Sequence, residues 1–192
     1  MVPAPPLSST HRLSPGASTA LTVAGVAGAG LLGGLIWAAV TGRRLVIAFK
    51  AGVPYPLLVK DVGNGAYLRS DAAQAFLWMA DEARAAGIPL AAGSAFRSMA
   101  EQSYLWSLSV TGKYKDKTGK NVPVAFPGTS NHQQAVTVDI TDGVQRGFDR
   151  DLWYASALFK WMLAHAPKFG WSWAEGKKIN EPWHWNYVGV GA

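Results

Sequence analysis

One uninterrupted apolar run dominates the N-terminal part of the hydrophobic pattern. Residues 20–41 contain no charged side chain over 22 positions, which is the length that a helix needs to cross the hydrocarbon core of a membrane. Arg43 and Arg44 follow this run, and residues 1–18 before it are rich in proline, serine and alanine. The pattern predicts a disordered tail over 1–18 and a transmembrane helix over 19–42.

Two other interpretations of the run stay open. A signal peptide usually has a shorter apolar stretch, and the small residues at 27–29 lie too early to be its cleavage site. A buried core helix rarely lacks charge on every face.

Half of the run is glycine or alanine, so its insertion into a membrane would be only weakly favourable. Basic residues after the run (Arg43, Arg44 and Lys50) outnumber Arg12 before it, and this excess alone favours a cytoplasmic C-terminal part.

The rest of the chain mixes helical and strand-like patterns without regular alternation. Helices are expected over 70–86, 99–109 and 151–165, and strands over 45–49, 88–96 and 136–140. A polar loop is expected over 111–128. Because the elements do not alternate as in βαβ units, the pattern favours the α+β class. We expect a linker with a first strand over 43–66, and then one domain over 67–192 with a small antiparallel sheet flanked by helices.

Composition narrows the classes of function. The chain has no cysteine, which excludes a thiolate nucleophile, a disulfide framework and a cysteine-ligated metal. The net charge of +6 suits an anionic partner such as anionic lipid, the acidic bacterial wall or nucleic acid. Nucleic acid is the weakest of the three, since no basic run is interleaved with aromatic residues. Five of the nine tryptophans fall in the last 32 residues, which indicates a tight core or an aromatic-walled cleft.

Four polar residues in apolar or aromatic surroundings carry the candidate chemistry: His132, Asp139, Glu181 and His184. Two neutral imidazoles and one carboxylate are a common ligand set for catalytic zinc, which leaves a fourth position for water. A further carboxylate can then take the proton of that water. The sequence offers one candidate for each of these roles. Taken singly, His132 can equally be a hydrogen-bonded surface residue and Asp139 a residue that caps a turn.

The spacing of these residues is weaker evidence than their identity. His132 and Asp139 are seven positions apart, which would put them on opposite faces of an unbroken strand. They can converge only if 132–134 forms a turn or bulge before the strand. Pro182 disfavours a helix between Glu181 and His184, so we expect an extended or bulged segment there. The helical HExxH zinc motif is absent from the sequence.

Three motifs resemble those of a known family. SNHQQAVTVD at 130–139 resembles the SxHxxGxAxD motif of the LAS metallopeptidases (lysostaphin, D-Ala-D-Ala peptidase and hedgehog-like). EPWHW at 181–185 resembles the signature of their VanY-type D,D-carboxypeptidase branch, and SAFRSMAEQ at 94–102 resembles the SGYRSxxEQ segment of that branch. The motifs follow the family's order and cover about residues 67–190.

The resemblance implies one zinc ion with three protein ligands, His132, Asp139 and His184. It also implies that Glu181 is the catalytic base and that Arg97 holds the substrate or the oxyanion. A guanidinium group suits that task because it stays charged and can bind a carboxylate through two hydrogen bonds. Gln102 and Ser130 are candidates either to support the ligands and Arg97 from behind or to contact the substrate. The alternative for Arg97 is a structural salt bridge.

Two positions depart from the family's pattern. Ala135 stands where the motif has glycine, and its methyl group can narrow the site if the backbone needs freedom there. Thr137 stands where the motif has alanine, and a β-branched residue fits a strand. Neither departure removes an implied ligand.

The resemblance implies zinc-dependent hydrolysis of peptidoglycan stem peptides, most directly as a D-Ala-D-Ala carboxypeptidase. The alternatives are an endopeptidase that cuts L-Ala-D-Glu or a cross-bridge, as in phage lysis enzymes, and a wall-binding protein without catalysis. Wall peptides lie outside the cytoplasmic membrane. We therefore expect an anchor through residues 20–41, with the peptidase domain on the periplasmic or extracellular side, and no nucleic-acid partner.

Overall fold

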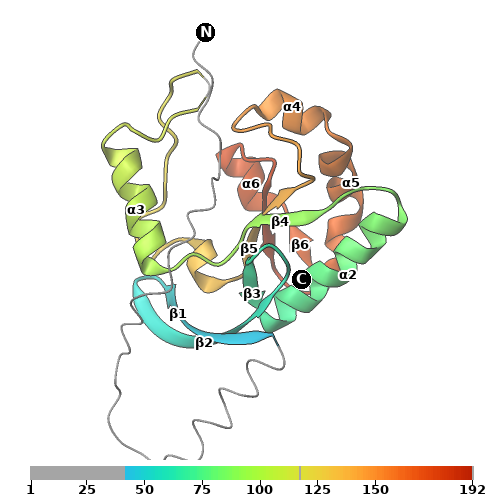
Figure 1. The fold of residues 1–192 in the computed structure, drawn as a ribbon, viewed down its shortest axis with the longest axis horizontal. Coiled ribbons are helices and arrows are strands. Elements are labelled where there is room, and N and C mark those ends of the chain that lie inside the picture. The colour runs from blue at the N-terminus through green and yellow to red at the C-terminus, as the bar shows by residue number, and fades with distance from the viewer. Residues whose placement is uncertain (1–41, 117, 192) are drawn as a thin grey trace, which may run out of the picture.

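The computed structural model describes residues 42–116 and 118–191 (Figure 1). The predicted tail over 1–18, and all but the last residue of the predicted transmembrane helix over 19–42, lie outside this part of the chain. Within the two described ranges, no helix combines the length and the apolar character that crossing a membrane requires.

Two antiparallel sheets and a set of helices confirm the α+β class (Figure 1). The first sheet has the order β1-β2-β3, with strands Arg43–Lys50, Val53–Asp61 and Tyr67–Arg69. The second sheet has the order β4-β5-β7-β6, with β4 at Ala91–Ser94, β5 at Thr137–Thr141, β6 at Trp171–Ser172 and β7 at His184–Tyr187. The α-helices are α2 (Ser70–Ala85), α3 (Met99–Val110), α4 (Arg150–Ala155), α5 (Ala157–His165) and α6 (Ala174–Ile179). Two short 3₁₀ helices are η1 (Asn131–Gln134) and η2 (Ala166–Phe169).

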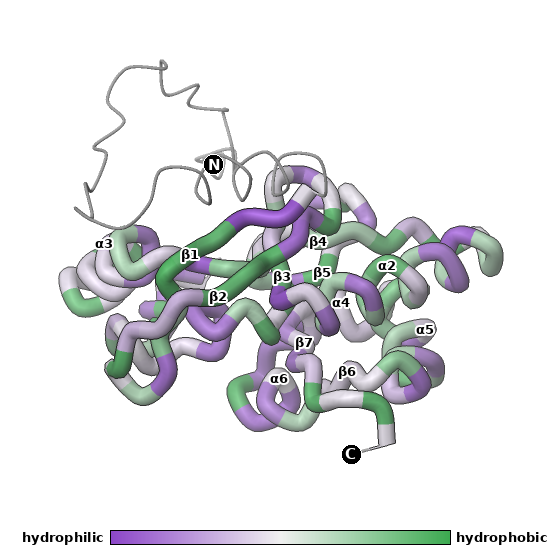
Figure 2. Tube along the Cα trace, turned by 90° about the horizontal axis from the view of Figure 1, so that it is seen from below, coloured by the Kyte–Doolittle hydropathy of each residue, from purple (hydrophilic) through white to green (hydrophobic). Residues whose placement is uncertain are grey.

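The β1–β2 hairpin crosses one side of the molecule (Figure 2). Its strands pair without interruption from Arg43 opposite Lys60 to Lys50 opposite Val53. The two residues of the turn, Ala51 and Gly52, both have positive φ, at 49° and 82°, as the tightest hairpin turns require. The hairpin therefore carries alanine at a position that favours asparagine or glycine.

Replacing Ala51 by asparagine is expected to raise the free energy of unfolding by about 1 kcal/mol, because asparagine adopts the left-handed conformation at lower cost. Ala51 is exposed, so its methyl group contributes no buried contact that the change would remove. Urea unfolding followed by fluorescence measures the difference. Ala174→Asn, at the exposed start of α6, is a control in which the new residue gains no such advantage. Equal stability of Ala51→Asn and the parent would contradict the strain argument.

The hairpin tip is attached to the loop that precedes η1. The backbone N–H of Gly52 donates a hydrogen bond to the carbonyl oxygen of Gly128 at 2.9 Å. A Cβ atom on Gly128 would lie 3.1 Å from the Cα of Gly52, which is tighter than ordinary contact. Gly128 N–H in turn donates to the side-chain oxygen of Gln133 at 2.6 Å. The hairpin is thus held to the segment that carries His132.

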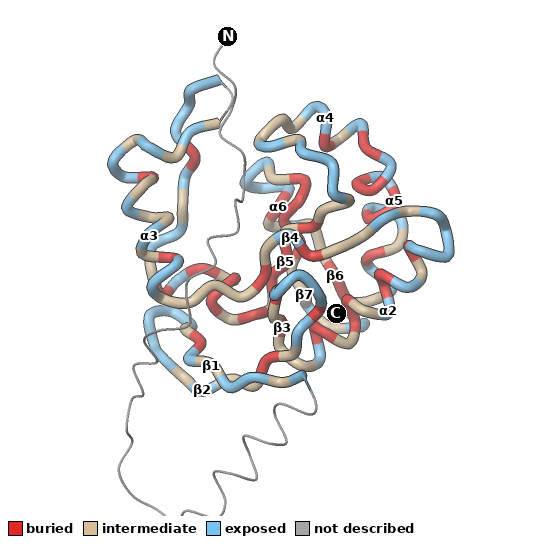
Figure 3. The backbone as a smooth tube through the Cα atoms, in the orientation of Figure 1, coloured by how far each residue is buried: buried red, intermediate tan, exposed pale blue. Residues whose placement is uncertain are grey.

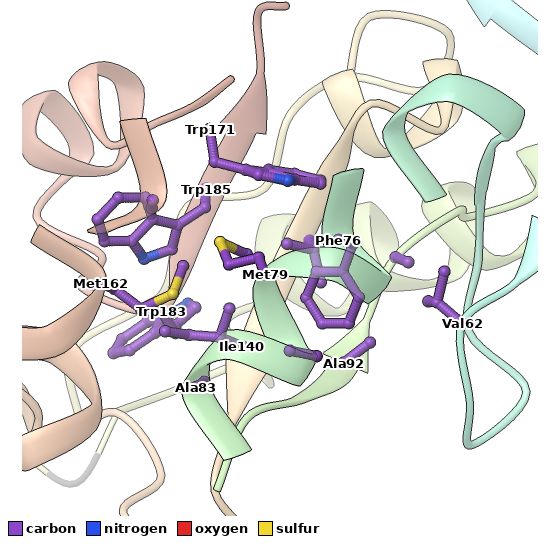
Figure 4. Packing of buried hydrophobic residues seen from close by; sticks show 14 of the residues in the cluster. Val62, Phe76, Met79, Ala83, Ala92, Ile140, Met162, Trp171, Trp183 and Trp185 are labelled. Atoms are coloured by element: carbon purple, nitrogen blue, oxygen red, sulfur yellow. The ribbon is translucent and has the colours of Figure 1, made fainter. Parts of the chain in front are cut away.

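The core lies between one face of the second sheet and the helices α2 and α5 (Figure 3). Phe76 and Met79 of α2 and Met162 of α5 belong to this core (Figure 4). Trp171 and Trp185 are almost completely buried, and Trp171 packs edge-to-face on Phe76 with ring centroids 6.0 Å apart. Trp171 and Trp185 therefore belong to a tight core, which is one of the two roles that the clustering of tryptophans indicated.

Two predicted elements differ from those observed, and a third agrees but lacks a side-chain cap. The helix expected over 151–165 is two helices, because Ser156 has an extended backbone and its hydroxyl oxygen accepts a hydrogen bond from Phe159 N–H. Serine in this role starts a new helix. The strand expected over 88–96 is reduced to Ala91–Ser94. Helix α2 begins at Ser70 as expected, but Arg69 is its N-cap residue, without a side-chain cap.

Candidate metal centre

The second sheet brings Asp139 and His184 together. They lie directly opposite each other on the antiparallel strands β5 and β7. Because side chains alternate between the faces of a strand, Val138 and Ile140 enter the core while Asp139 points to the other face. Nδ1 of His184 lies 3.2 Å from Oδ1 of Asp139. Strand register alone therefore sets this half of the centre.

His132 reaches the same point from η1. The hydroxyl oxygen of Ser130 accepts the His132 backbone N–H at 3.3 Å and caps this 3₁₀ turn. Ala135 then adopts a left-handed conformation with φ 54°, and β5 starts two residues later. The predicted turn at 132–134 is confirmed. Because His132 lies in this turn and not in β5, the seven-residue spacing does not put it on the opposite face from Asp139. Nε2 of His132 lies 3.4 Å from Oδ1 of Asp139.

The left-handed conformation of Ala135 explains why the family motif has glycine at this position. Alanine occupies the conformation here at a cost of about 1–2 kcal/mol, and its side chain is fully buried. The departure noted in the sequence thus affects the backbone geometry next to the site, and the ligand candidates keep their places.

The tautomer of His132 leaves one ring nitrogen available to a metal. Nδ1 lies 2.7 Å from the carbonyl oxygen of Ala95. A carbonyl can only accept, so Nδ1 carries the proton and Nε2 presents its lone pair toward Asp139. Burial lowers the pKa of His132, although the charge of Asp139 opposes this effect. A neutral imidazole whose second nitrogen is fixed by a backbone carbonyl is a typical metal ligand.

A carboxylate faces each ring nitrogen of His184. Burial alone would lower the pKa of His184, but the contacts with Asp139 and Glu175 raise it to about 9. Nε2 lies 3.6 Å from Oε2 of Glu175, close enough for an ion pair and slightly long for a hydrogen bond. Nε2 faces Glu175, and Nδ1 faces Asp139. A metal bound at Nδ1 would compete with a proton at that atom.

The donor set fits zinc. Ligand atoms of His132, Asp139 and His184 lie within 4.8 Å of one another. Two atoms each about 2.0–2.1 Å from a tetrahedral ion are separated by about 3.3–3.4 Å. The distances from Oδ1 of Asp139 to the two imidazoles, 3.4 and 3.2 Å, match this separation. Two imidazoles and one carboxylate are a ligand set typical of catalytic zinc.

Glu181 lies beside this set. Its Oε2 is 3.8 Å from Nδ1 of His184. Burial, together with the negative charge of Asp139, raises the pKa of Glu181 to about 7. A turn fixes the residue, since Glu181 N–H donates to Gly176 and its carbonyl oxygen accepts from His184 N–H and the Trp173 indole. The segment 181–184 is therefore a turn leading into β7. It is not helical, as expected from Pro182, but it is a turn where an extended or bulged segment was expected.

Arg97 lies against the same centre, between β4 and α3. One terminal nitrogen, Nη2, is 3.0 Å from Oδ2 of Asp139 and 3.0 Å from Nε2 of His132. Its other terminal nitrogen is 3.5 Å from the side-chain oxygen of Gln102. Ser98 and Glu101 form a capping box that starts α3 directly after Arg97, and such a box fixes where a helix begins. Part of the SAFRSMAEQ segment is therefore structural.

The two other predicted site residues, Gln102 and Ser130, both make hydrogen bonds within the protein. Gln102 is completely buried and donates to the carbonyl oxygen of Ala125 at 2.8 Å, so it holds the loop 111–128 as well as facing Arg97. Ser130 is buried under η1 and caps it. Both residues line the same cleft as the candidate ligands.

A cleft of about 560 Å³ opens at this centre. One wall comes from α3 and the loop after it, and the opposite wall comes from α6 and the segment before β7. The lining includes all the candidate site residues, together with Tyr114, Phe148, Arg150 and Trp183. Burial raises the pKa of Tyr114. The sequence pattern did not indicate Tyr114, because this residue lies in the segment 111–128, which was predicted to be a polar loop.

Glu175 is a second residue that the sequence pattern missed. Its Oε2 accepts a hydrogen bond from Asn131 at 2.7 Å and a further one from Asn186. The neighbouring imidazole of His184, followed by the hydrogen bonds from Asn186 and Asn131, lowers the pKa of Glu175 to about 2. No motif marks it, since its partners come from η1 and β7 and meet it only in the folded chain. Glu175 thus orients His184 from the side away from Asp139.

Replacing Glu175 by glutamine is expected to weaken zinc binding about 10–100-fold, as found for carboxylates that orient a metal-bound imidazole. Competition with a chelating dye measures the affinity. Glu82→Gln is the control, because Glu82 pairs with His165 and Lys168 at the surface. Zinc affinity equal to that of the control would show that Glu175 does not position His184.

A buried set of two imidazoles and one carboxylate, beside a further carboxylate in an open cleft, defines a mononuclear zinc hydrolase. This is the class of protein that the fold and the site indicate. The chain belongs to the VanY D-alanyl-D-alanine carboxypeptidase family, whose sequence profile matches residues 65–190. Family membership confirms the resemblance drawn from the three motifs.

Two curated relatives agree with this assignment. The chain is 34% identical over 133 residues to the putative carboxypeptidase YodJ of Bacillus subtilis, which covers 64% of the chain and 47% of YodJ. It is 30% identical over 128 residues to a D-alanyl-D-alanine carboxypeptidase of Enterococcus faecalis, which covers 58% of the chain and 45% of that protein. The chain therefore spans about half the length of these relatives.

A solved structure shares both fold and metal. The vancomycin-resistance D,D-pentapeptidase VanY from a VanB-type cassette, solved as a mutant with bound Zn(II), is 25% identical to the chain with a TM-score of 0.55. The match covers 77% of the chain and 89% of that structure. Zinc is thus the metal of a relative with this fold.

Proposed function

We propose that the chain is a zinc-dependent peptidase of peptidoglycan stem peptides that removes the terminal residue of D-Ala-D-Ala. The convergence of His132, Asp139 and His184 beside Glu181, in one open cleft, carries this proposal. Membership of the VanY family supports it, as does the carboxypeptidase name of the Enterococcus relative.

Zinc held by His132, Asp139 and His184 would supply a Lewis acid that polarises a carbonyl and lowers the pKa of water. Glu181 takes the proton of the attacking water and passes it to the departing amine. A carboxyl with a pKa near 7 can both accept and donate at neutral pH, and the charge of a bound cation would lower this pKa.

Arg97 supplies fixed positive charge on the other side of the centre. Its guanidinium group can bind a substrate carboxylate or a developing oxyanion through two hydrogen bonds. Its contacts to Asp139 and His132 hold it at the rim of the ligand set. Gln102 supports Arg97 from α3, and Ser130 supports the turn that carries His132.

Digestion of purified muropeptides by the zinc-loaded full chain, with products weighed by mass spectrometry, tests the proposal. Loss of one alanine from a peptide ending in D-Ala-D-Ala is the expected result. Release of a larger fragment would replace it with the endopeptidase alternative. Unchanged substrate together with binding to the wall would favour the non-catalytic alternative.

We also propose that residues 20–41 anchor the chain, with the working domain outside the cytoplasmic membrane. An uncharged run of sufficient length supports the anchor, and the location of the substrate outside the membrane supports the orientation. The basic residues after the run favour the opposite orientation, but the bias is only a few charges. A reporter that is active only outside the cytoplasm, fused after Ala192, tests the topology. A silent reporter in membrane fractions would contradict it.

A further inference from the structure

The outer face of the β1–β2 hairpin carries an apolar surface. Residues opposite each other in an antiparallel pair share one face, and on this face the members are Arg43, Leu45, Ile47 and Phe49 from β1 with Lys60, Leu58, Pro56 and Pro54 from β2. The six residues between the two cations are all apolar. Leu45 and Ile47 are 67% and 56% exposed, so this hairpin face has no cover within the described part of the chain.

Part of the opposite face of the same hairpin is already buried. Ala48 and Val59 are fully inaccessible, and the hairpin packs there on η1 and α2. The contacts of that face attach the hairpin to the domain, so the apolar residues of the outer face are not needed for this attachment. Contiguous exposed apolar residues with a polar rim are typical of an interaction surface.

Charge around the outer face is mainly positive. Residues 43–61 contain four basic residues and one acidic residue, Asp61 at the end of β2. Arg43 and Lys60 lie opposite each other at one end of the hairpin, and Lys50 lies at the tip. Figure 2 shows the apolar middle of the strands with hydrophilic residues at that first end. This pattern suits a partner that is apolar below its surface and negatively charged at it.

We infer that the outer face of this hairpin rests on an anionic lipid bilayer, with Leu45 and Ile47 in the interfacial region and the basic residues among the headgroups. Segments that lie in the interface plane combine these same features. The uncharged run of 20–41 ends one residue before Arg43, with Gly42 between them. One residue spans less than about 4 Å, so a run held in the membrane would keep the hairpin at its surface.

Two other occupants fit the charge less well. Residues 20–41 carry no acidic side chain, so folding back over the hairpin would cover the apolar residues without bringing negative charge to the basic end of the hairpin. A second copy joined through the same face would bring two sets of four cations together. An anionic bilayer satisfies both the apolar and the basic parts of the surface.

The chain offers a direct test because it contains no cysteine. A single cysteine introduced as Ile47→Cys in the full chain can carry an environment-sensitive fluorophore. Val144→Cys is the matched control, because Val144 is also 56% exposed but lies in the loop after β5. Zinc content and thermal melting confirm that each labelled variant is folded. Vesicles of phosphatidylcholine and phosphatidylglycerol in equal parts, with spin-labelled acyl chains, provide the surface.

The label at position 47 is expected to shift to the blue and to be quenched several-fold more by the vesicles than the label at position 144. If the chain floats with the vesicles but both labels report water, the inference is wrong while the anchor stands. If the label at 47 is shifted without vesicles, another occupant covers the face and the inference is again wrong. Loss of that shift on dilution identifies a second copy, and its persistence identifies residues 20–41.

Discussion

Glu181→Gln is expected to lower turnover by about 10²–10⁴-fold, the usual contribution of a general base, while the protein keeps its zinc. The amide has the size and shape of the carboxylate but cannot accept a proton from water. Glu181 lies 3.8 Å from His184 and outside the three-residue ligand set, so the change leaves that set intact. Its backbone bonds to Gly176 and Trp173 do not involve the altered group.

Turnover on a D-Ala-D-Ala peptide and zinc content of the same sample measure this separation. Glu175→Gln provides the matched comparison, because it removes a charge at a similar distance from His184. At saturating zinc we expect Glu175→Gln to recover most of its turnover and Glu181→Gln to recover none. Loss of zinc from Glu181→Gln would mean that Glu181 is a ligand.

His184→Ala is expected to abolish zinc binding and activity together. The change leaves two of three protein ligands, so affinity falls by more than the roughly 10–100-fold that an orienting residue contributes. Dialysis followed by elemental analysis should find the parent near one zinc per chain and the variant near none. Stoichiometric zinc in the variant would overturn the ligand assignment.

Two further measurements keep this second result interpretable. His165→Ala is the control for loss of an imidazole, since His165 stacks on Trp161 and pairs with Glu82 far from the centre. It should retain zinc and activity. Thermal melting of metal-free samples shows whether His184→Ala is folded, because metal loss then no longer separates the two proteins. A folded variant without zinc is the expected combination.

The sequence predicted best the features that depend on local chemistry. Helix α3 starts where expected because Ser98 and Glu101 form its capping box. The turn at 132–134 followed from the need to bring His132 and Asp139 to one side. In both cases the information lies within a few neighbouring positions, so no tertiary contact was needed to find it.

Features that depend on distant contacts could not be predicted. Glu175 acquires its role only when α6 meets Asn131, which is 44 positions away. Arg97 reaches Asp139 across 42 positions, and the sequence suggested the arginine only through the family resemblance. The break at Ser156 was missed because the apolar spacing continues through it. The hydroxyl oxygen of Ser156 accepts the Phe159 N–H, so one helix ends here and a new one begins.

The strand pairing that places Asp139 opposite His184 has a consequence for how such enzymes can diversify. Inserting one residue in β5 before Asp139 would turn its side chain into the core, so insertions within this strand should be eliminated by selection. The loop 111–128 lines the cleft and contributes none of the three ligand candidates. Apart from Gly128, which contacts the hairpin tip, and Ala125, whose carbonyl oxygen Gln102 binds, its length and sequence can therefore vary. Exchange of this loop between relatives is the natural route to a new choice of scissile bond on an unchanged metal centre.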